Sequence, residues 1–306
     1  MSFEVTPWGG HSARLQLPGS PVVVEQLSVG QHRAIAEDYG AYIPSRGETS
    51  CEEHVVCRAG RLQQPIGFPH EHFLVNGQYS ITKRRLGTSI EITGFDFAAR
   101  FDRRAASVLS SATLLVAREE ELPRASVLGN FLRVLLAHRA LDRGGVMLHS
   151  AGVVQGGRAY LFSGRSNAGK TTLTSKAAAA GLRVLSDDIN VVIPVLSQYR
   201  AHKVPFTGEF GRQVPTGVEP GSFPLGGLAL LEKAPMLTAA PVSPAEAVAG
   251  LLTGCPFVND DPEEFPALME VLTRLVASTP VIRIGVALED PFEAVLESME
   301  RHCGHG

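Results

Sequence analysis

Residues 164–171 read Gly-Arg-Ser-Asn-Ala-Gly-Lys-Thr and match the pattern G-x-x-x-x-G-K-[ST] of a phosphate-binding loop. In such a loop, backbone N–H groups converge on phosphate oxygens, and the helix that follows directs the positive end of its dipole at them. We expect Lys170 to reach the β- and γ-phosphates and the hydroxyl of Thr171 to bind Mg²⁺. The pattern therefore predicts ATP binding with Mg²⁺, by residues Gly164, Arg165, Ser166, Asn167, Ala168, Gly169, Lys170, Thr171 and Thr172.

Two adjacent carboxylates, Asp187 and Asp188, follow the loop after a helix-like run and a short apolar segment. In phosphate-loop enzymes, an aspartate at the end of a strand holds magnesium. Neighbouring carboxylates repel each other unless a metal ion or a lysine balances their charge. One carboxylate would then support the metal, and the other would take the proton of an acceptor hydroxyl. The alternative is that the pair caps a turn.

The elements around the loop have the order that a phosphate loop needs. Residues 158–164 are predicted to form the strand before it, and residues 171–181 the helix after it. His149 lies in an apolar strand predicted at 146–155, where a histidine is more often a core residue than a catalyst. Further strands are expected at 182–188, 190–196, 228–234 and 279–288, helices at 243–254, 264–278 and 290–302, and a loop region between Val204 and Gly227.

The pattern of the chain changes near residue 122. Before that point, short runs rich in β-branched residues alternate with turn residues, and Asn76-Gly77 is the clearest hairpin signal. After it, apolar residues recur at helical spacing as far as Gly145. We therefore expect a β-rich accessory region at 1–121, assigned to acceptor recognition, and a mixed α/β domain at 122–306 that holds the motifs.

Composition limits the classes of function. The chain has 306 residues, 44% hydrophobic and 19% charged, which is typical of a globular protein with one or two domains. A net charge of -3 and a pI near 6.4 give no basic footprint for nucleic acid. No apolar run approaches the roughly 20 residues that cross a bilayer, and no signal-peptide pattern opens the sequence. With four cysteines and no C-x-x-C pair, we expect a cytoplasmic protein with reduced thiols and no membrane partner.

From Gly129 onward the sequence resembles the catalytic domain of HPr kinase/phosphorylase and of HPr-kinase-related proteins, which share a core with phosphoenolpyruvate carboxykinases. The segments LHSAGVV, LFSGRSNAGKTTL and GLRVLSDDINVV carry the resemblance, in register from His149 through Lys170 to Asp188. It implies an α/β fold in which a mixed β-sheet with flanking helices carries the P-loop, preceded by the β-rich region. It also implies catalytic roles for His149, Lys170 and Asp188, with Asp188 taking the acceptor proton, and places Thr171 and Asp187 at the metal.

The sequence departs from this family at three places. Asn167 stands where the family's loop usually has glycine, so the turn of the loop is expected to differ slightly. The later family signature is not recognisable in VPFTGEFGR, where Glu209 is a candidate for a further magnesium ligand and equally fits a solvated loop carboxylate. The N-terminal region does not resemble that of HPr kinase, so HPr is not implied as the substrate.

These observations predict a Mg²⁺-requiring kinase that transfers the γ-phosphoryl group of ATP to a hydroxyl on a small molecule, peptide or protein. One alternative is a regulatory or assembly ATPase module that binds nucleotide without transferring phosphate. Another is a phosphorylase or carboxykinase-like enzyme that runs a different reaction at the same site. The sequence does not name the acceptor, because acceptor pockets lie on variable loops. It also leaves open whether the chain forms a homo-oligomer.

Overall fold

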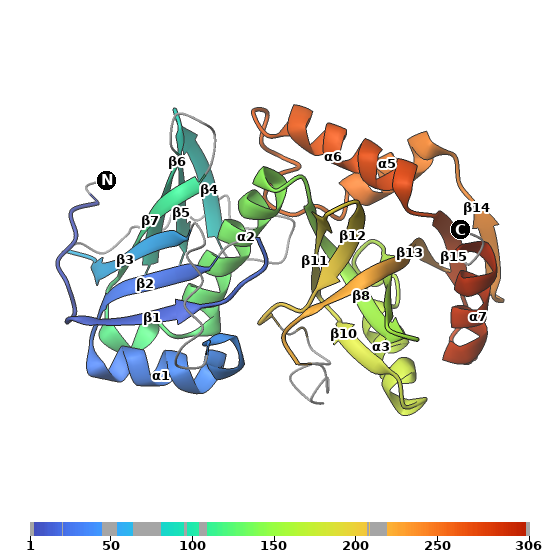
Figure 1. Ribbon diagram of the computed structural model, residues 1–306, viewed down its shortest axis with the longest axis horizontal. Helices are drawn as coiled ribbons and strands as arrows, with labels where there is room; N and C mark the ends of the chain where they lie inside the picture. The colour runs from blue at the N-terminus through green and yellow to red at the C-terminus, as the bar shows by residue number, and fades with distance from the viewer. Residues whose placement is uncertain are drawn as a thin grey trace. The chain divides into compact units, whose positions relative to one another are not determined.

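The computed structural model describes residues 3–19, 21–44, 54–63, 81–94, 97–103, 109–206, 208 and 219–303. The chain divides into two compact units, Met1–Asp142 and Arg143–Gly306. Each unit contains a β-sheet with both parallel and antiparallel pairs, and together the described elements make a mixed α/β protein with a β-rich N-terminal part (Figure 1). The expected hairpin at Asn76-Gly77 and the candidate ligand Glu209 lie outside the described residues.

The sheet of the first unit has seven strands in the order β1-β2-β3-β7-β6-β5-β4. The β-rich pattern of this region is therefore confirmed for its described part. Strand β2 pairs in parallel with β3, and β3 with β7, whereas the remaining neighbours are antiparallel. The strands are β1 His11–Leu15, β2 Val22–Leu27, β3 Val55–Arg61, β4 Ile81–Leu86, β5 Ser89–Gly94, β6 Phe97–Arg103 and β7 Leu109–Val116.

Helix α1, Val29–Tyr39, was not predicted from the sequence. Its N-terminus is fixed by a capping box, in which the Ser28 hydroxyl accepts from the N–H of Gln31 and the Gln31 side chain accepts from the N–H of Ser28. Only Gln31, Ile35 and Tyr39 are buried on this helix. So few buried positions give only a weak helical periodicity in the sequence. The capping box is therefore a clearer sign of this helix than its hydrophobic pattern.

Helix α2, Asn130–Asp142, follows a π-helical turn at Ala125–Gly129 and packs in the first unit. The sequence division had placed it in the second. Phe131 stacks on Phe101 of β6 with ring centroids 5.1 Å apart. At the other end of the helix, Asp142 accepts from the N–H of Leu109 at 3.1 Å and forms an ion pair with Arg103 at 3.2 Å. These contacts tie the helix to β6 and β7, so the compact unit ends after Asp142.

Among the described residues, the sheet of the second unit has eight strands. Seven of them follow the order β10-β8-β11-β12-β13-β15-β14. The eighth strand, β9, pairs with β8 on one edge and with β13 on the other. Strand β13 pairs in parallel with both β9 and β15, and its other partner, β12, is antiparallel. The strands are β8 Val146–Gln155, β9 Arg158–Ser163, β10 Arg183–Ser186, β11 Ile189–Val195, β12 Gln198–His202, β13 Ser222–Lys233, β14 Thr238–Pro241 and β15 Val281–Val286.

Both faces of this sheet are covered by helices (Figure 1). Ala229 and Leu231 of β13 face the core that α3 and α7 close, whereas Leu230, between them, points at Gly250 of α5. This alternation is the two-residue period of a strand. The helices are α3 Lys170–Ala179, α5 Pro244–Leu252, α6 Phe265–Ser278 and α7 Phe292–Cys303.

The predicted elements of this unit are found close to their expected bounds, with one correction. Strand β13 begins at Ser222, so the end of the region read as a loop between Val204 and Gly227 is strand. Its first residues, Ser222-Phe223-Pro224, lack a run of β-branched residues, and they are held in the sheet by pairing with Arg200–His202 of β12. Helix α5 begins with a capping box between Ser243 and Glu246, with Pro244 as its first residue.

The described residues include no helix long and apolar enough to cross a membrane. Cys57, Cys255 and Cys303, the cysteines among them, are free thiols and buried. Burial raises the pKa of each thiol well above its ordinary value, so all three are uncharged at neutral pH.

The assignment of α2 to the first unit can be tested with the single tryptophan, Trp8, which lies under the guanidinium of Arg61 in that unit. Phe131 is fully buried. We expect Phe131→Ala to lower the free energy of unfolding, followed by Trp8 fluorescence in denaturant, by about 3–5 kcal/mol, the usual cost of truncating a core phenylalanine. Phe292→Ala, the matched truncation in the second unit, should leave the Trp8 transition in place. Equal shifts in both variants would contradict the division after Asp142.

Candidate functional site

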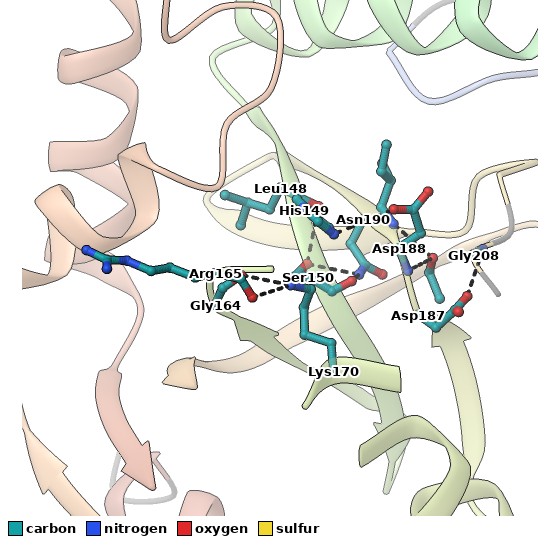
Figure 2. Close-up of polar contacts among 12 residues, drawn as sticks. Leu148, His149, Ser150, Gly164, Arg165, Lys170, Asp187, Asp188, Asn190 and Gly208 are labelled. Carbon is teal, nitrogen blue, oxygen red and sulfur yellow. Dashed lines mark hydrogen bonds and ion pairs between the residues drawn. The ribbon is translucent and has the colours of Figure 1, made fainter. Parts of the chain in front are cut away.

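The three sequence motifs meet at one point of strand β8, residues 149–150 (Figure 2). Ser150 pairs with Ser163, the last residue of β9 and the one before the loop. On the other edge of β8, His149 pairs with Ile189, and the N–H of Ser150 donates to the carbonyl of Asp188 at 3.0 Å. The register of β8 with its neighbours therefore brings together residues that are up to 40 positions apart in the sequence.

The aspartate pair occupies a break between two strands that share the same partner. Strand β10 ends with Ser186 opposite Gly152 of β8, and β11 begins with Ile189 opposite His149. The two aspartates form the bend that joins the two strands. The turn is closed by the hydroxyl of Ser186, which accepts from the N–H groups of Asp188 at 3.2 Å and Ile189 at 3.1 Å. A serine thus supplies the cap that the sequence had left as the alternative role of the aspartates.

Asp188 lies beside His149 of β8. The Nε2 atom of His149 lies 3.7 Å from Oδ1 of Asp188, and the two side chains are only 17% and 16% exposed. Burial, together with the nearby charge of Lys170, lowers the pKa of His149 to about 4. The imidazole is therefore neutral at pH 7, and its contact with Asp188 is that of a dipole with a carboxylate. The strand position is held by the N–H of His149, which donates to the carbonyl of Gly254 at 2.7 Å.

Lys170 is the first residue of α3 and is buried in the loop. Its ammonium donates to the carbonyls of Gly164 at 2.8 Å and Arg165 at 3.0 Å. Burial lowers the pKa of Lys170, and the negative charge of Asp188 acts in the opposite direction. The loop therefore holds a cation at its centre, on the side that faces Asp188.

The backbone of the loop takes two left-handed conformations. Gly169, the N-cap of α3, has φ +103°, and Asn167 has φ +64°. Asparagine is one of the few residues other than glycine that adopt this region readily. Asn167 therefore stands in the conformation that glycine would allow, which is why the loop can close without a glycine at this position.

Asp187 is more deeply buried than Asp188 and has different partners. Its carboxylate, 4% exposed, accepts from the N–H of Gly208 at 2.9 Å. A Cβ on Gly208 would stand 2.4 Å from that carboxylate, so only glycine fits there. The ammonium of Lys203 donates to the carbonyl of Leu185 at 2.6 Å. Burial lowers the pKa of Lys203 to about 8, and the charge of Asp187 opposes this shift.

Each aspartate is thus electrostatically coupled to its own lysine, Asp188 to Lys170 and Asp187 to Lys203. The sequence analysis expected a metal ion or a lysine to balance the pair. It did not identify Lys203, because this residue belongs to no motif and reaches the site only through the pairing of β11 with β12. The available sequence signal is its position directly after β12, the strand that pairs with β11.

A second missed residue, Asn190, supports the floor of the site (Figure 2). Its Nδ2 atom donates to the carbonyl of Ser150 at 2.8 Å and to the hydroxyl of Ser150 at 3.0 Å. A Cβ on Gly152 would lie 2.5 Å from Oδ1 of Asn190, so the glycine of LHSAGVV leaves space for this amide. Both contacts lock β11 to β8 beside the residues that face the loop.

The candidate metal ligands are brought together only in part. Thr171, exposed at the start of α3, and the two aspartates lie in the same unit, whereas Glu209 is not among the described residues. Within the described ranges, no three His, Cys, Asp or Glu side chains form a group that could hold a metal ion by themselves. Magnesium usually takes one or two carboxylates, with waters and substrate phosphates completing its octahedron. The oxygen donors that are present fit such a shared site.

Comparison with known proteins gives a match to one family model and matches to solved structures. A family model described as "SynChlorMet cassette protein ScmC" matches residues 124–258, a stretch that contains His149, the loop and the aspartate pair and is less than half of the chain. None of the curated proteins matches. Among solved structures, the chain is similar to "Structure of the Hpr(Ser) kinase/phosphatase from Coxiella burnetii", with 12% sequence identity and a TM-score of 0.30, over 51% of this chain and 95% of that chain. At this TM-score the likeness carries no argument about activity.

Proposed function

We propose that the second unit is a Mg²⁺-dependent phosphotransferase, which moves the γ-phosphoryl group of ATP to a hydroxyl on a small molecule, peptide or protein. The observation that carries the proposal is the convergence of the loop, the histidine and the aspartate pair on residues 149–150 of β8. A phosphate loop alone supports nucleotide binding. A carboxylate coupled to the loop lysine and in contact with a neutral histidine adds a group that can take a proton.

The loop supplies the phosphate site. The N–H groups of residues 165–170 and the N-terminus of α3 provide donors and a positive dipole end, and Lys170 provides a full charge. In the described conformation Lys170 binds the carbonyls of Gly164 and Arg165. On nucleotide binding, its ammonium would exchange these carbonyls for phosphate oxygens. Thr171 and Asp187 would hold Mg²⁺, which neutralises charge on the phosphates.

Asp188 takes the proton in the proposed transfer. As the acceptor oxygen forms its bond to the γ-phosphorus, its hydrogen passes to Asp188, and the bond from the γ-phosphorus to the bridging oxygen breaks to release ADP. His149 is neutral, so it adds no charge that would compete for the carboxylate. Its ring, 3.7 Å from Asp188, is placed to orient the acceptor hydroxyl by a hydrogen bond.

We expect the two aspartates to differ when each is made neutral. Asp188→Asn should leave Mg-ATP affinity within a few fold and lower phosphoryl transfer by about 10²–10⁴, the usual loss for a positioned general base. Asp187→Asn should weaken the Mg²⁺-dependent part of ATP binding, because an amide is a poorer magnesium ligand than a carboxylate. Calorimetry with Mg-ATP and a transfer assay against candidate acceptors measure both quantities.

Each of these variants is the matched control for the other, since they differ by one position in the same turn. A regulatory module without transferase activity predicts two similar defects in metal-dependent binding and no transfer to lose. That result would overturn the separate roles of Asp187 and Asp188.

The protonation state of His149 can be measured directly. Its folded-state pKa of about 4 lies below its ordinary value, so the folded protein binds fewer protons than the unfolded chain between about pH 4 and 6.5. Stability should therefore rise with pH across this window, and His149→Gln should make that rise shallower. NMR titration of the ligand-free protein should give a midpoint near 4 for the ring signal that His149→Gln removes.

His202, half-buried in β12, has its pKa lowered to about 4 by the same main cause and serves as the control. We expect His202→Gln to change the pH dependence of stability in the same direction as His149→Gln does. Its loss of phosphoryl transfer should be smaller than the loss caused by His149→Gln. A midpoint above 7 for His149 would mean that the histidine is mostly charged at pH 7, which contradicts the proposed role of a neutral ring.

We further propose that the first unit, 1–142, recognises the acceptor. The support is that the phosphate loop, His149 and the aspartates all lie in the second unit. A chain that starts at Arg143 should therefore keep Mg-ATP affinity within a few fold while losing transfer to acceptors. Loss of nucleotide binding by a truncated protein that still shows a cooperative unfolding transition would contradict this division of roles.

A further inference from the structure

A cavity of about 270 Å³ lies beside the phosphate loop in the second unit. One wall is the loop and the first turns of α3, including Ala168, Thr172 and Leu173. The opposite wall comes from the end of β13 at Leu231 and from the residues that end and follow β15, including Val286 and Leu288. Most of this lining is apolar, and its charged members are lysines.

The position of the cavity follows from the parallel part of the sheet. Strands β9 and β15 both run parallel to β13, so the carboxyl ends of all three lie at one edge. The loop follows β9 at this edge, and the cavity opens beyond the ends of β13 and β15. Ligands of α/β sheets bind outside the carboxyl ends of parallel strands. Ala168 and Gly169 belong to both the loop and the cavity, which makes the two sites continuous.

The far wall of the cavity is held in place by three hydrogen bonds. The ammonium of Lys176, in the second turn of α3, donates to the carbonyls of Leu288 and Asp290. The carboxylate of Asp290 accepts from the N–H of Ala287 at 2.7 Å. The segment after β15 is therefore fastened to α3, which fixes the far wall of the cavity.

We propose that this cavity binds the purine base of the nucleotide whose phosphates occupy the loop, and that it does not discriminate adenine from guanine. The inference rests on the proposed function, because it takes the loop as the phosphate site. The apolar side chains offer a flat ring a place removed from water. Among the described residues, the side chains that line the cavity include no carboxylate or carboxamide. Strong rejection of a base needs such groups, which would be left unpaired by the wrong hydrogen-bonding edge.

The test uses the full chain and three probes, Mg-ATP, Mg-GTP and the magnesium complex of inorganic tripolyphosphate, with affinities from calorimetry. The wild-type protein should bind Mg-ATP at least about tenfold more tightly than tripolyphosphate, a difference of about 1.4 kcal/mol from burial of the base. Mg-GTP should bind within about tenfold of Mg-ATP, because shape alone separates similar ligands only weakly.

Two variants fill the cavity. Leu288 is 73% exposed, so Leu288→Trp can add bulk over the opening without disturbing the core, and Ala234→Trp fills the end next to β13. Both should weaken Mg-ATP and Mg-GTP by about tenfold or more and leave tripolyphosphate within about threefold. Met236 is exposed and two residues from Ala234, outside the cavity lining. Met236→Trp is therefore the matched control and should change none of the three affinities.

The outcomes separate the two proposals. If the wild-type protein binds neither Mg-ATP nor tripolyphosphate, the loop is not a nucleotide site, and the proposed function fails together with this inference. If tripolyphosphate binds as tightly as Mg-ATP, or if both filling variants keep wild-type affinity for Mg-ATP, the cavity is not the base site while the loop stands. A difference between Mg-ATP and Mg-GTP well above tenfold overturns the lack of discrimination.

Discussion

The candidate site depends on the register of strand β8 with three other strands. At residues 149–150, β8 changes partners on both edges, from β11 to the bend at Asp187-Asp188 on one side and from the Gly254 carbonyl to β9 on the other. A shift by one residue would turn His149 to the opposite face of the sheet and separate it from Asp188. Apolar neighbours on both sides of the strand, Leu148 and Ala151, resist such a shift because each is fully buried.

Burial of charge is the second constraint. Lys170, Asp187 and Lys203 are each less than a tenth exposed, and isolated charges at such depth would be strongly unfavourable. The arrangement offsets this cost with short contacts: carbonyls for the two ammonium groups, a backbone N–H for Asp187, and a lysine near each carboxylate. These contacts allow the charged groups to remain buried in the folded protein, because each has a polar partner in place of water.

Helix α2 shows why a helical sequence pattern does not reveal which sheet the helix packs against. Helix α2 is buried on every side, including Arg133, His138 and Arg139, so its sequence shows little of the amphipathic contrast that marks a surface helix. Its place is decided by contacts at both ends, Phe131 on Phe101 and Asp142 with Arg103 and Leu109. Each of these partners lies more than 25 residues away in the sequence.

Sequence patterns are enough to locate the loop, the aspartate pair and the histidine, together with most elements of the second unit. These are local signals: a glycine pattern, periodic apolar residues and the cap at Ser243. Three features of the site follow from tertiary contacts instead. Lys203 lies near Asp187, Ser186 and not an aspartate closes the turn, and His149 is neutral. The assignment of α2 to the first unit also depends on tertiary contacts. The reason is that burial, strand register and electrostatic coupling depend on residues far apart in the chain, which no local pattern encodes.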